Sequence, residues 1–278
     1  MYNTNISIMK DYHRHEKTGI KKRPPQLVDR REFLKLRSGA ALGLTDSPLF
    51  LSSCREMKMQ KRTLGRTGEK VSIITVGGLH MSWIETPDGH IDVKEQEAIG
   101  IVRGAIDAGV NFCDNAYGYN KGRSEELMGK ALKDGYRDKV MIMTKVPGRS
   151  VKTVNEQLET SLKRYQVDCI DVMQFHVIGT WELDVDRVYN DGLLEWAEKM
   201  RDKGHIRYIG FTGHNDPDAH IDMIERGFKW ETCQFPVNLV DYNNPGKSFS
   251  RDVLPLCNEK NIGVIAMKSN GYGRDWYK

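Results

Sequence analysis

The sequence lacks the patterns that mark several large classes of protein. No apolar run reaches the roughly 18 residues that span a bilayer, so a transmembrane span is not expected. None of the five cysteines belongs to a C-x-x-C pair or has a histidine beside it at metal-ligand spacing. This pattern argues against a zinc site, an iron–sulfur site and a disulfide framework, so no metal is predicted.

A basic surplus, which would suggest a nucleic-acid partner, is absent from most of the chain. The 278 residues carry a net charge of +4, and residues 1–55 hold 11 Lys and Arg against 5 Asp and Glu. The remainder has 31 basic and 33 acidic residues and offers no electrostatic case for nucleic acid. A composition of 39% hydrophobic and 29% charged residues is typical of a globular protein with a sizeable core.

Residues 1–55 have the composition of a leader. Residues 1–29 are polar and basic without an apolar period, and we expect them to be disordered. The run R-R-E-F-L-K at 30–35, an apolar stretch and the run L-S-S-C ending at Cys54 follow in order. They resemble a twin-arginine export signal with a lipobox, which predicts a periplasmic or lipid-anchored protein. The alternative is a cytoplasmic protein with a chance basic pair and an ordinary thiol at Cys54.

From Lys61 onward, short aliphatic or β-branched runs alternate with helical patterns. A small hairpin is expected over 61–72, followed by strands over 72–76, 111–114, 140–145, 169–176, 208–212, 232–237 and 263–267. The expected helices contain residues 98–106, 125–132, 154–165, 193–200, 217–224 and 253–259. Ser124 and Asp216 are the expected N-caps of two of them, and Gly109 is an expected stop signal.

This alternation predicts an α/β fold with parallel strands. So many units without a dinucleotide-binding glycine loop favour a (β/α)8 TIM-type barrel, here over residues 56–278, and not an open doubly wound sheet. Seven strands are readable. After Lys268 only ten residues remain, whereas another βα unit needs about 20. We therefore expect an incomplete barrel that lacks the eighth strand.

Three ionisable residues close three successive predicted strands. Asp114, Lys145 and His176 are each separated by 31 residues, which is one βα repeat. Because function in such barrels collects at the carboxyl ends of the strands, these side chains should meet at one mouth. A lone aspartate or histidine at a strand end is usually structural, but equal spacing argues against coincidence.

These residues carry a family resemblance. Residues 111–119, N-F-C-D-N-A-Y-G-Y, and 124–132, S-E-E-L-M-G-K-A-L, resemble the signature of the aldo-keto reductases. Residues 141–145 and 171–176 resemble the family's two other catalytic segments. The similarity extends from about Lys61 to Lys268. It implies a (β/α)8 barrel that reduces an aldehyde or ketone with NADPH.

The resemblance implies a catalytic tetrad of Asp114, Tyr119, Lys145 and His176. Tyr119 is preferred because the family's tyrosine lies five residues after its aspartate; Tyr117 is interpreted as a packing aromatic. Hydride addition to a carbonyl builds negative charge on its oxygen, which Tyr119 would neutralise as general acid. Lys145, held by Asp114, would stabilise the phenolate, and His176 would orient the carbonyl.

The resemblance also implies contacts to the cofactor and substrate. The implied NADP(H)-binding residues are Thr212, Gly213, Gln234, Asn238, Met267 and Lys268. Gln234 would hold the carboxamide, and Lys268 would approach the phosphates. Gly213 stands where asparagine is commoner, and Met267 where many members have an aromatic that stacks on nicotinamide. Strand packing is an equal alternative for Met267. The substrate candidates are His214, Trp83 and Trp181.

Two other functional hypotheses stay open. One is a nucleotide-binding regulatory or redox-sensing subunit on the same scaffold, because a fold does not determine a function. The other is an inactive fragment that binds nothing. The partner in the leading hypothesis is a small carbonyl compound.

Overall fold

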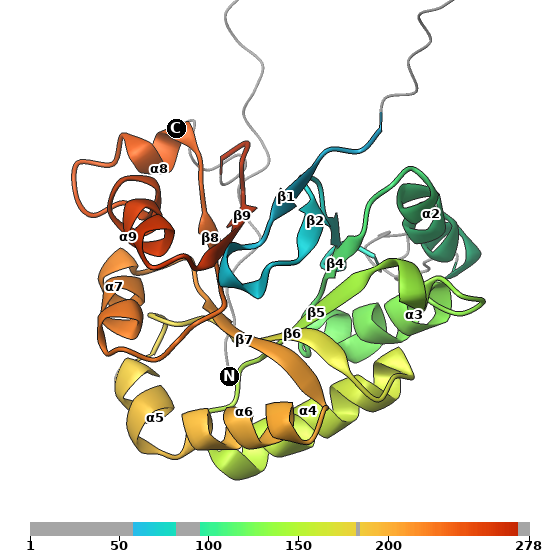
Figure 1. Ribbon diagram of the computed structural model, residues 1–278, viewed down its shortest axis with the longest axis horizontal. Coiled ribbons are helices and arrows are strands. Elements are labelled where there is room, and N and C mark those ends of the chain that lie inside the picture. Colours follow the sequence, from blue (N-terminus) through green and yellow to red (C-terminus); the bar gives the residue numbers. More distant parts are fainter. Residues whose placement is uncertain (1–57, 82–94, 182–183, 272–278) are drawn as a thin grey trace, which may run out of the picture. The chain divides into compact units, whose positions relative to one another are not determined.

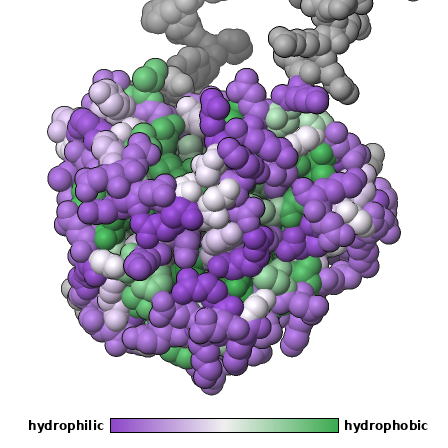
Figure 2. Space-filling view, viewed as in Figure 1, coloured by the Kyte–Doolittle hydropathy of each residue, from purple (hydrophilic) through white to green (hydrophobic). Residues whose placement is uncertain are grey.

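The computed structural model describes residues 58–81, 95–181 and 184–271 (Figure 1). The predicted boundary between leader and barrel, Cys54 and Trp83 lie outside these residues. Among the described helices, none is both long enough and apolar enough to cross a bilayer. The face drawn in Figure 2 is largely hydrophilic, with scattered apolar side chains between the charged ones.

Within the described residues, seven parallel strands form one sheet in the order β3-β4-β5-β6-β7-β8-β9. Their bounds are β3 Val76–Gly77, β4 Phe112–Asp114, β5 Met141–Val146, β6 Ile170–Phe175, β7 Ile206–Thr212, β8 Thr232–Pro236 and β9 Gly263–Met267. The strands follow one another in sequence order, and the sheet curls as in a barrel (Figure 1). The predicted α/β barrel class is thus confirmed; the missing eighth strand stays a prediction.

Helices cover the outer face of the curled sheet (Figure 1). Their bounds are α2 Glu95–Asp107, α3 Arg123–Ala131, α4 Val151–Tyr165, α5 Asp184–Asn190, α6 Leu193–Asp202, α7 Pro217–Glu225, α8 Leu239–Tyr242 and α9 Leu254–Glu259, with a π-helical turn at Phe249–Val253. In α4 the buried side chains Val154, Leu158 and Tyr165 recur at helical spacing. The main core lies between these apolar stripes and the outward-facing strand residues.

The predicted hairpin is present as β1 (Lys61–Thr63) and β2 (Lys70–Ser72), which pair antiparallel. Its Leu64 and Val71 pack in a second apolar cluster with Phe112, Met143 and other strand residues. The predicted strand over 72–76 is wrong in its bounds. Ser72 still belongs to β2, and its hydroxyl donates to the carbonyl of Ile74 at 2.6 Å, so the chain turns before β3 begins.

One predicted helix cap is confirmed and one is wrong. The Asp216 carboxylate accepts from the Asp218 amide at 2.9 Å, and Pro217 opens α7. Ser124 does not cap α3, because Gly122 occupies that position and Ser124 lies in the first turn. The backbone reaches the helix through three successive positive φ values, 50° at Asn120, 56° at Lys121 and 94° at Gly122. Gly109, at φ 98°, lies just after the end of α2, as expected of a stop signal.

Candidate active site

The carboxyl ends of β4, β5 and β6 bring three of the predicted residues together. Asp114 ends β4, Lys145 is the penultimate residue of β5, and His176 directly follows β6. The sheet register aligns Asp114 with Met143 and Lys145 with Gln174, so the three residues lie at one end of the sheet. The equal spacing in the sequence therefore corresponds to a common mouth.

Lys145 is buried, with 1% of its surface exposed, beside the carboxylate of Asp114. Its ammonium donates to Asp114 Oδ1 and, at 2.6 Å, to the carbonyl of Asn115. Burial lowers the pKa of Lys145. Its interactions with Asp114 and Tyr119 raise the pKa by more than burial lowers it, so the net shift is upward. The amine is consequently a permanent positive charge at neutral pH.

Tyr119 lies on the turn after β4 and faces both of its predicted partners. The Lys145 nitrogen is 5.0 Å from the centre of the Tyr119 ring, and interaction with Tyr119 contributes to the raised pKa of Lys145. The rings of Tyr119 and His176 are 5.9 Å apart in an edge-to-face arrangement. The ring of Tyr117 instead lies 4.7 Å from the Arg164 guanidinium. The structure thus gathers Tyr119, not Tyr117, with the predicted tetrad.

His176 is held neutral by its surroundings. Burial, followed by the charges of Lys145 and Arg149 and by His214, lowers the pKa of His176 to about 3. Arg149 also donates to the His176 carbonyl at 2.7 Å and forms a buried ion pair with Asp184 at 2.9 Å. A neutral imidazole retains one N–H, so His176 can donate a hydrogen bond to a carbonyl oxygen without transferring a full positive charge.

The ends of β7 and β8 contribute a hydroxyl and an amide. Thr212 and Gln234 are aligned in the sheet register, and the Thr212 hydroxyl donates to Gln234 Oε1 at 3.4 Å. The other end of the Gln234 amide donates to Asp114 Oδ2 at 2.7 Å. Sequence reasoning did not predict this contact. One carboxylate is therefore shared between the lysine of β5 and the glutamine of β8.

Gly213 and Asn238 have clear local roles. A Cβ atom at Gly213 would lie 2.2 Å from the Ile178 carbonyl oxygen and 2.6 Å from the His220 ring, so only glycine fits. Asn238 caps α8 by accepting from the Asp241 amide at 2.8 Å, and it donates to the Lys268 carbonyl at 3.0 Å. Asn238 thereby ties the loop after β8 to the end of β9.

The other candidates among the described residues lie at or after the carboxyl ends of β6, β7 and β9. Met267 ends β9 in register with Pro236 and is half-buried. Burial and the charge of Lys268 lower the pKa of His214, which places these two side chains within electrostatic range of each other. Trp181 is 51% exposed, and its ring lies 5.4 Å from the Arg149 guanidinium.

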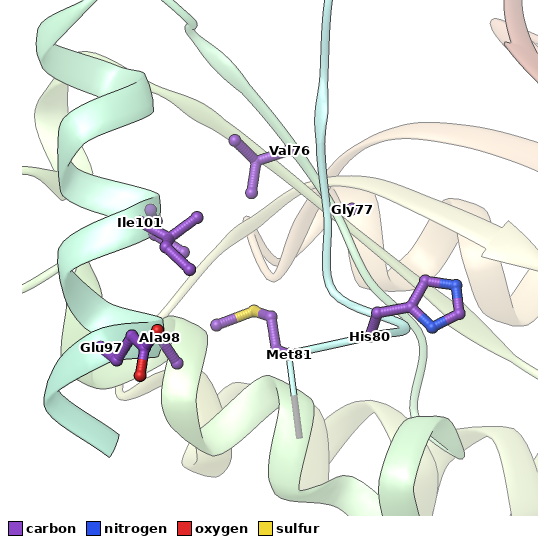
Figure 3. A pocket seen from close by; sticks show the side chains of 8 residues that line it. Val76, Gly77, His80, Met81, Glu97, Ala98 and Ile101 are labelled. Atoms are coloured by element: carbon purple, nitrogen blue, oxygen red, sulfur yellow. The ribbon is translucent and has the colours of Figure 1, made fainter. Parts of the chain in front are cut away.

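A cavity of about 290 Å³ lies between β3 and α2, apart from the tetrad (Figure 3). Val76, Met81 and Ile101 point toward it, while the His80 ring points away (Figure 3). Its lining is largely apolar and contains none of the four tetrad residues. The chemistry indicated by the charged residues therefore belongs to the mouth and not to this cavity.

Comparison with known proteins relates most of the chain to one protein family. The family described as "Aldo/keto reductase family" matches residues 74–274. L-galactose dehydrogenase of Arabidopsis thaliana is 29% identical over 228 residues, which are 75% of this chain and 65% of that protein. A protein of Oryza sativa subsp. japonica named "Probable voltage-gated potassium channel subunit beta" is 40% identical over 165 residues, 51% of this chain and 48% of that one.

Solved structures agree with the sequence comparisons. The aldo/keto reductase of Klebsiella pneumoniae in complex with NADP and acetate superimposes with a TM-score of 0.60 and 26% identity. The match covers 75% of this chain and 68% of that one. In the sequence comparisons, the chain spans between about half and two thirds of the length of the two curated relatives.

Proposed function

Because this chain belongs to the aldo/keto reductase family, we propose that it reduces an aldehyde or ketone by hydride transfer from NADPH, with Tyr119 as general acid. The observation that carries the proposal is the meeting of Tyr119, Lys145 and His176 over the carboxylate of Asp114. A phenol, an ammonium, an imidazole and a carboxylate at one strand-end mouth suit a reaction that places negative charge on a carbonyl oxygen.

The polar groups at the ends of β7 and β8 fit the carboxamide of a nicotinamide. A carboxamide presents one acceptor and two N–H donors, and Thr212 with Gln234 offers a hydroxyl and an amide oxygen on adjacent strands. Met267 and Lys268 would then lie toward the ring and the phosphates. When bound, the reduced nicotinamide supplies the hydride. The Klebsiella pneumoniae structure with NADP supports the choice of cofactor.

Proton donation falls to Tyr119. As the carbonyl carbon gains the hydride, its oxygen takes up negative charge, and the Tyr119 hydroxyl transfers its proton to that oxygen. A phenol is a weak acid, so the phenolate that remains needs a cation nearby. The buried Lys145 ammonium supplies it, and attraction to Asp114 keeps that ammonium charged.

His176 would orient the carbonyl and not protonate it. Its pKa of about 3 leaves the ring neutral at physiological pH, with an N–H that can donate to the substrate oxygen. Its ring already lies edge-to-face with Tyr119, so one oxygen can accept from both groups. Two donors on one oxygen stabilise the charge that develops during hydride transfer.

The test is carbonyl-dependent NADPH oxidation by the Tyr119→Phe variant. Loss of the phenolic proton should lower kcat by about 10²- to 10⁴-fold, the range typical of a general acid, while NADPH binding persists. Tyr117→Phe is the matched control, two residues away, and should retain kcat within about 2-fold because its ring contacts Arg164. Equal activity of Tyr119→Phe and the wild-type protein would refute the proposal.

A second candidate function is a nucleotide-binding regulatory or redox-sensing subunit. The 40% identity to the rice protein named as a potassium channel subunit favours it. Such a protein should quench NADPH fluorescence on binding yet show no turnover across a broad panel of aldehydes. Turnover that depends on Tyr119 would instead favour the reductase. Failure of both binding and turnover would indicate an inactive polypeptide.

We propose further that residues 1–55 form an export leader. The supporting pattern is the arginine pair at positions 30 and 31 before an apolar stretch that leads to Cys54. Fused to a reporter that is active only after export of the folded protein, the leader should direct export. The double variant Arg30→Lys, Arg31→Lys should not export the reporter. The Cys54→Ser variant should still export it but should lose lipid labelling. Export by the double variant would contradict the proposal.

A further inference from the structure

A buried ion pair lies beneath the turn that carries Tyr119. Arg164, near the end of α4, bonds Glu125 of α3 at 3.0 Å, and the Glu125 side chain is fully buried. Removing two charges from water is costly, and a buried pair often stabilises a protein no more than apolar residues would. The proposed tetrad does not include this pair, so its other contacts indicate what it does.

The Arg164 guanidinium contacts the Tyr119 turn at three places. It donates to the Tyr117 carbonyl at 2.8 Å and lies 4.7 Å from the centre of the Tyr117 ring. A Cβ atom at Gly122 would lie 2.2 Å from the guanidinium carbon, so the turn fits over Arg164 only with glycine there. Arg164 therefore contacts the turn on both sides of Tyr119.

Glu125 also contacts β5, the strand that carries Lys145. Its second oxygen accepts a hydrogen bond from the hydroxyl of Thr144, which is fully buried and directly precedes Lys145. Because side chains alternate along a strand, Thr144 points outward to α3 while Lys145 points to the mouth. One carboxylate thus links the turn of Tyr119, through Arg164, with the strand of Lys145.

The turn itself has a backbone that needs support. Asn120 and Lys121 follow Tyr119 with φ values of 50° and 56°, a region that residues other than glycine rarely adopt. Such conformations persist where the surroundings hold them. The Tyr119 amide bonds the Ala116 carbonyl of the same turn at 3.1 Å. The Asn120 side-chain amide donates to the Leu79 carbonyl at 2.8 Å and to the Ser124 hydroxyl at 2.7 Å, and the contacts of Arg164 hold the turn from α4.

We propose that Glu125 and Arg164 are positioning residues that set the separation between the Tyr119 hydroxyl and the Lys145 ammonium. The inference rests on the proposed reductase function. An error of about 1 Å in such a separation can cost 10²-fold in rate, even when no contact to the substrate is changed. The pair then acts on kcat through Tyr119 and leaves the nucleotide site on β7 to β9 unaffected.

The experiment compares Arg164→Met with Arg103→Met. Arg103 is the control for the kinds of contact: it also pairs with a carboxylate (Asp134, which is exposed), donates to a backbone carbonyl (Ala131) and lies 4.7 Å from a tyrosine ring (Tyr136). We expect Arg164→Met to lower kcat about 10-fold or more, with KM and the Kd for NADPH within about 2-fold of wild type. Arg103→Met should keep all three within about 2-fold.

Two further measurements separate positioning from general damage. In the Tyr119→Phe background, Arg164→Met should lower the residual rate less than 2-fold, because the group that it positions is gone. Amide hydrogen exchange over residues 115–122 should become about 10-fold faster in Arg164→Met and stay unchanged in Arg103→Met. Arg164→Lys keeps a charge opposite Glu125 so that the protein folds, and its kcat should lie between those of wild type and Arg164→Met.

The outcomes distinguish the two proposals. An unchanged kcat in Arg164→Met, or an equal loss with and without Tyr119, would overturn the positioning role while leaving the reductase function in place. If Tyr119→Phe is as active as wild type, or no carbonyl is reduced, the proposed function fails. The exchange measurement then still decides whether Arg164 holds the turn, because it needs no substrate.

Discussion

The two halves of the mouth differ in the chemistry of their side chains. The β4 to β6 half presents Asp114, Lys145 and His176, with the lysine buried and the histidine half-buried. The β7 to β9 half presents the uncharged Thr212 and Gln234 at two of its strand ends, and Lys268 follows the third. A proton transfer needs charges held out of water, whereas a neutral carboxamide needs only oriented hydrogen bonds.

The two halves are joined at one carboxylate. Asp114 accepts from Lys145 through one oxygen and from Gln234 through the other. A charge removed from water is tolerated only where it is paired and hydrogen-bonded, so both contacts stabilise the Asp114 carboxylate. The comparison teaches that a neutral amide from one half also stabilises the charged residues of the other.

The largest effect expected is that of Lys145→Met, which removes the only cation shown bonded to Asp114 in the described structure. We expect kcat to fall by about 10²- to 10⁴-fold and the free energy of unfolding by about 3–5 kcal/mol, because the Asp114 carboxylate, with a side chain 17% exposed, loses its partner. Enzyme kinetics and urea unfolding measure the two. Lys139→Met breaks an exposed pair with Asp107 and should cost at most about 1 kcal/mol. Similar losses in both variants would contradict the assignment.

Acid should destabilise both halves, because each contains a histidine with a lowered pKa. Burial lowers the pKa of His176 to about 3 and that of His220, behind β7 and β8, to about 4, against 6.5 in the unfolded chain. The unfolded chain binds more protons, so this stability is present above pH 6.5 and is lost as pH falls toward the folded values. Each histidine contributes about 1.4 kcal/mol per pH unit in that window.

Urea unfolding between pH 7 and 4 measures this slope. His176→Gln and His220→Gln should each reduce it, and the double variant should reduce it by about the sum of the two. If either variant kept the wild-type slope, that histidine would not contribute to the loss of stability in acid.

An intermediate effect is expected for Gln234→Leu. Loss of a hydrogen bond to a charged group costs about 1.5–3 kcal/mol, so kcat should fall about 10- to 100-fold through Asp114, and the Kd for NADPH should rise. Gln174→Leu removes a bond to the neutral hydroxyl of Thr232 and should cost kcat less than about 5-fold. A rise in Kd with unchanged kcat would mean that Gln234 serves the cofactor alone.

The smallest effect is expected for Trp181→Ala at the rim. The side chain is half exposed and its contact with Arg149 is a cation–π pair, worth about 0.5–1 kcal/mol at such a site. KM for bulky aldehydes should rise about 2- to 5-fold, with kcat for small ones unchanged. Steady-state kinetics with acetaldehyde and benzaldehyde measure the difference. Equal KM values for wild type and variant would exclude Trp181 from the substrate site.

The order of the strands and most helices were predictable, but α5, α8 and some local bounds were not. The Asp216–Pro217 start of α7 and the positive φ at Gly109 follow from local rules that a sequence displays. Ser124 has the composition of a cap, yet the left-handed turn at Asn120 and Lys121 moves the helix start to Arg123. That turn is held by contacts with residues over 40 positions away, such as Arg164 to Tyr117, which no local pattern reveals.

The sequence by itself determined the parallel barrel-type sheet and the gathering of Asp114, Lys145 and His176, because one βα repeat returns the chain to the same edge. Only the tertiary structure decided that Gln234 bonds Asp114, that Arg149 bonds the His176 carbonyl, and that a buried glutamate links the tyrosine turn to the lysine strand. Periodicity specifies which end of a strand a residue occupies. The partner of a buried polar atom depends on which helices and strands pack around it, and that is decided over the whole fold.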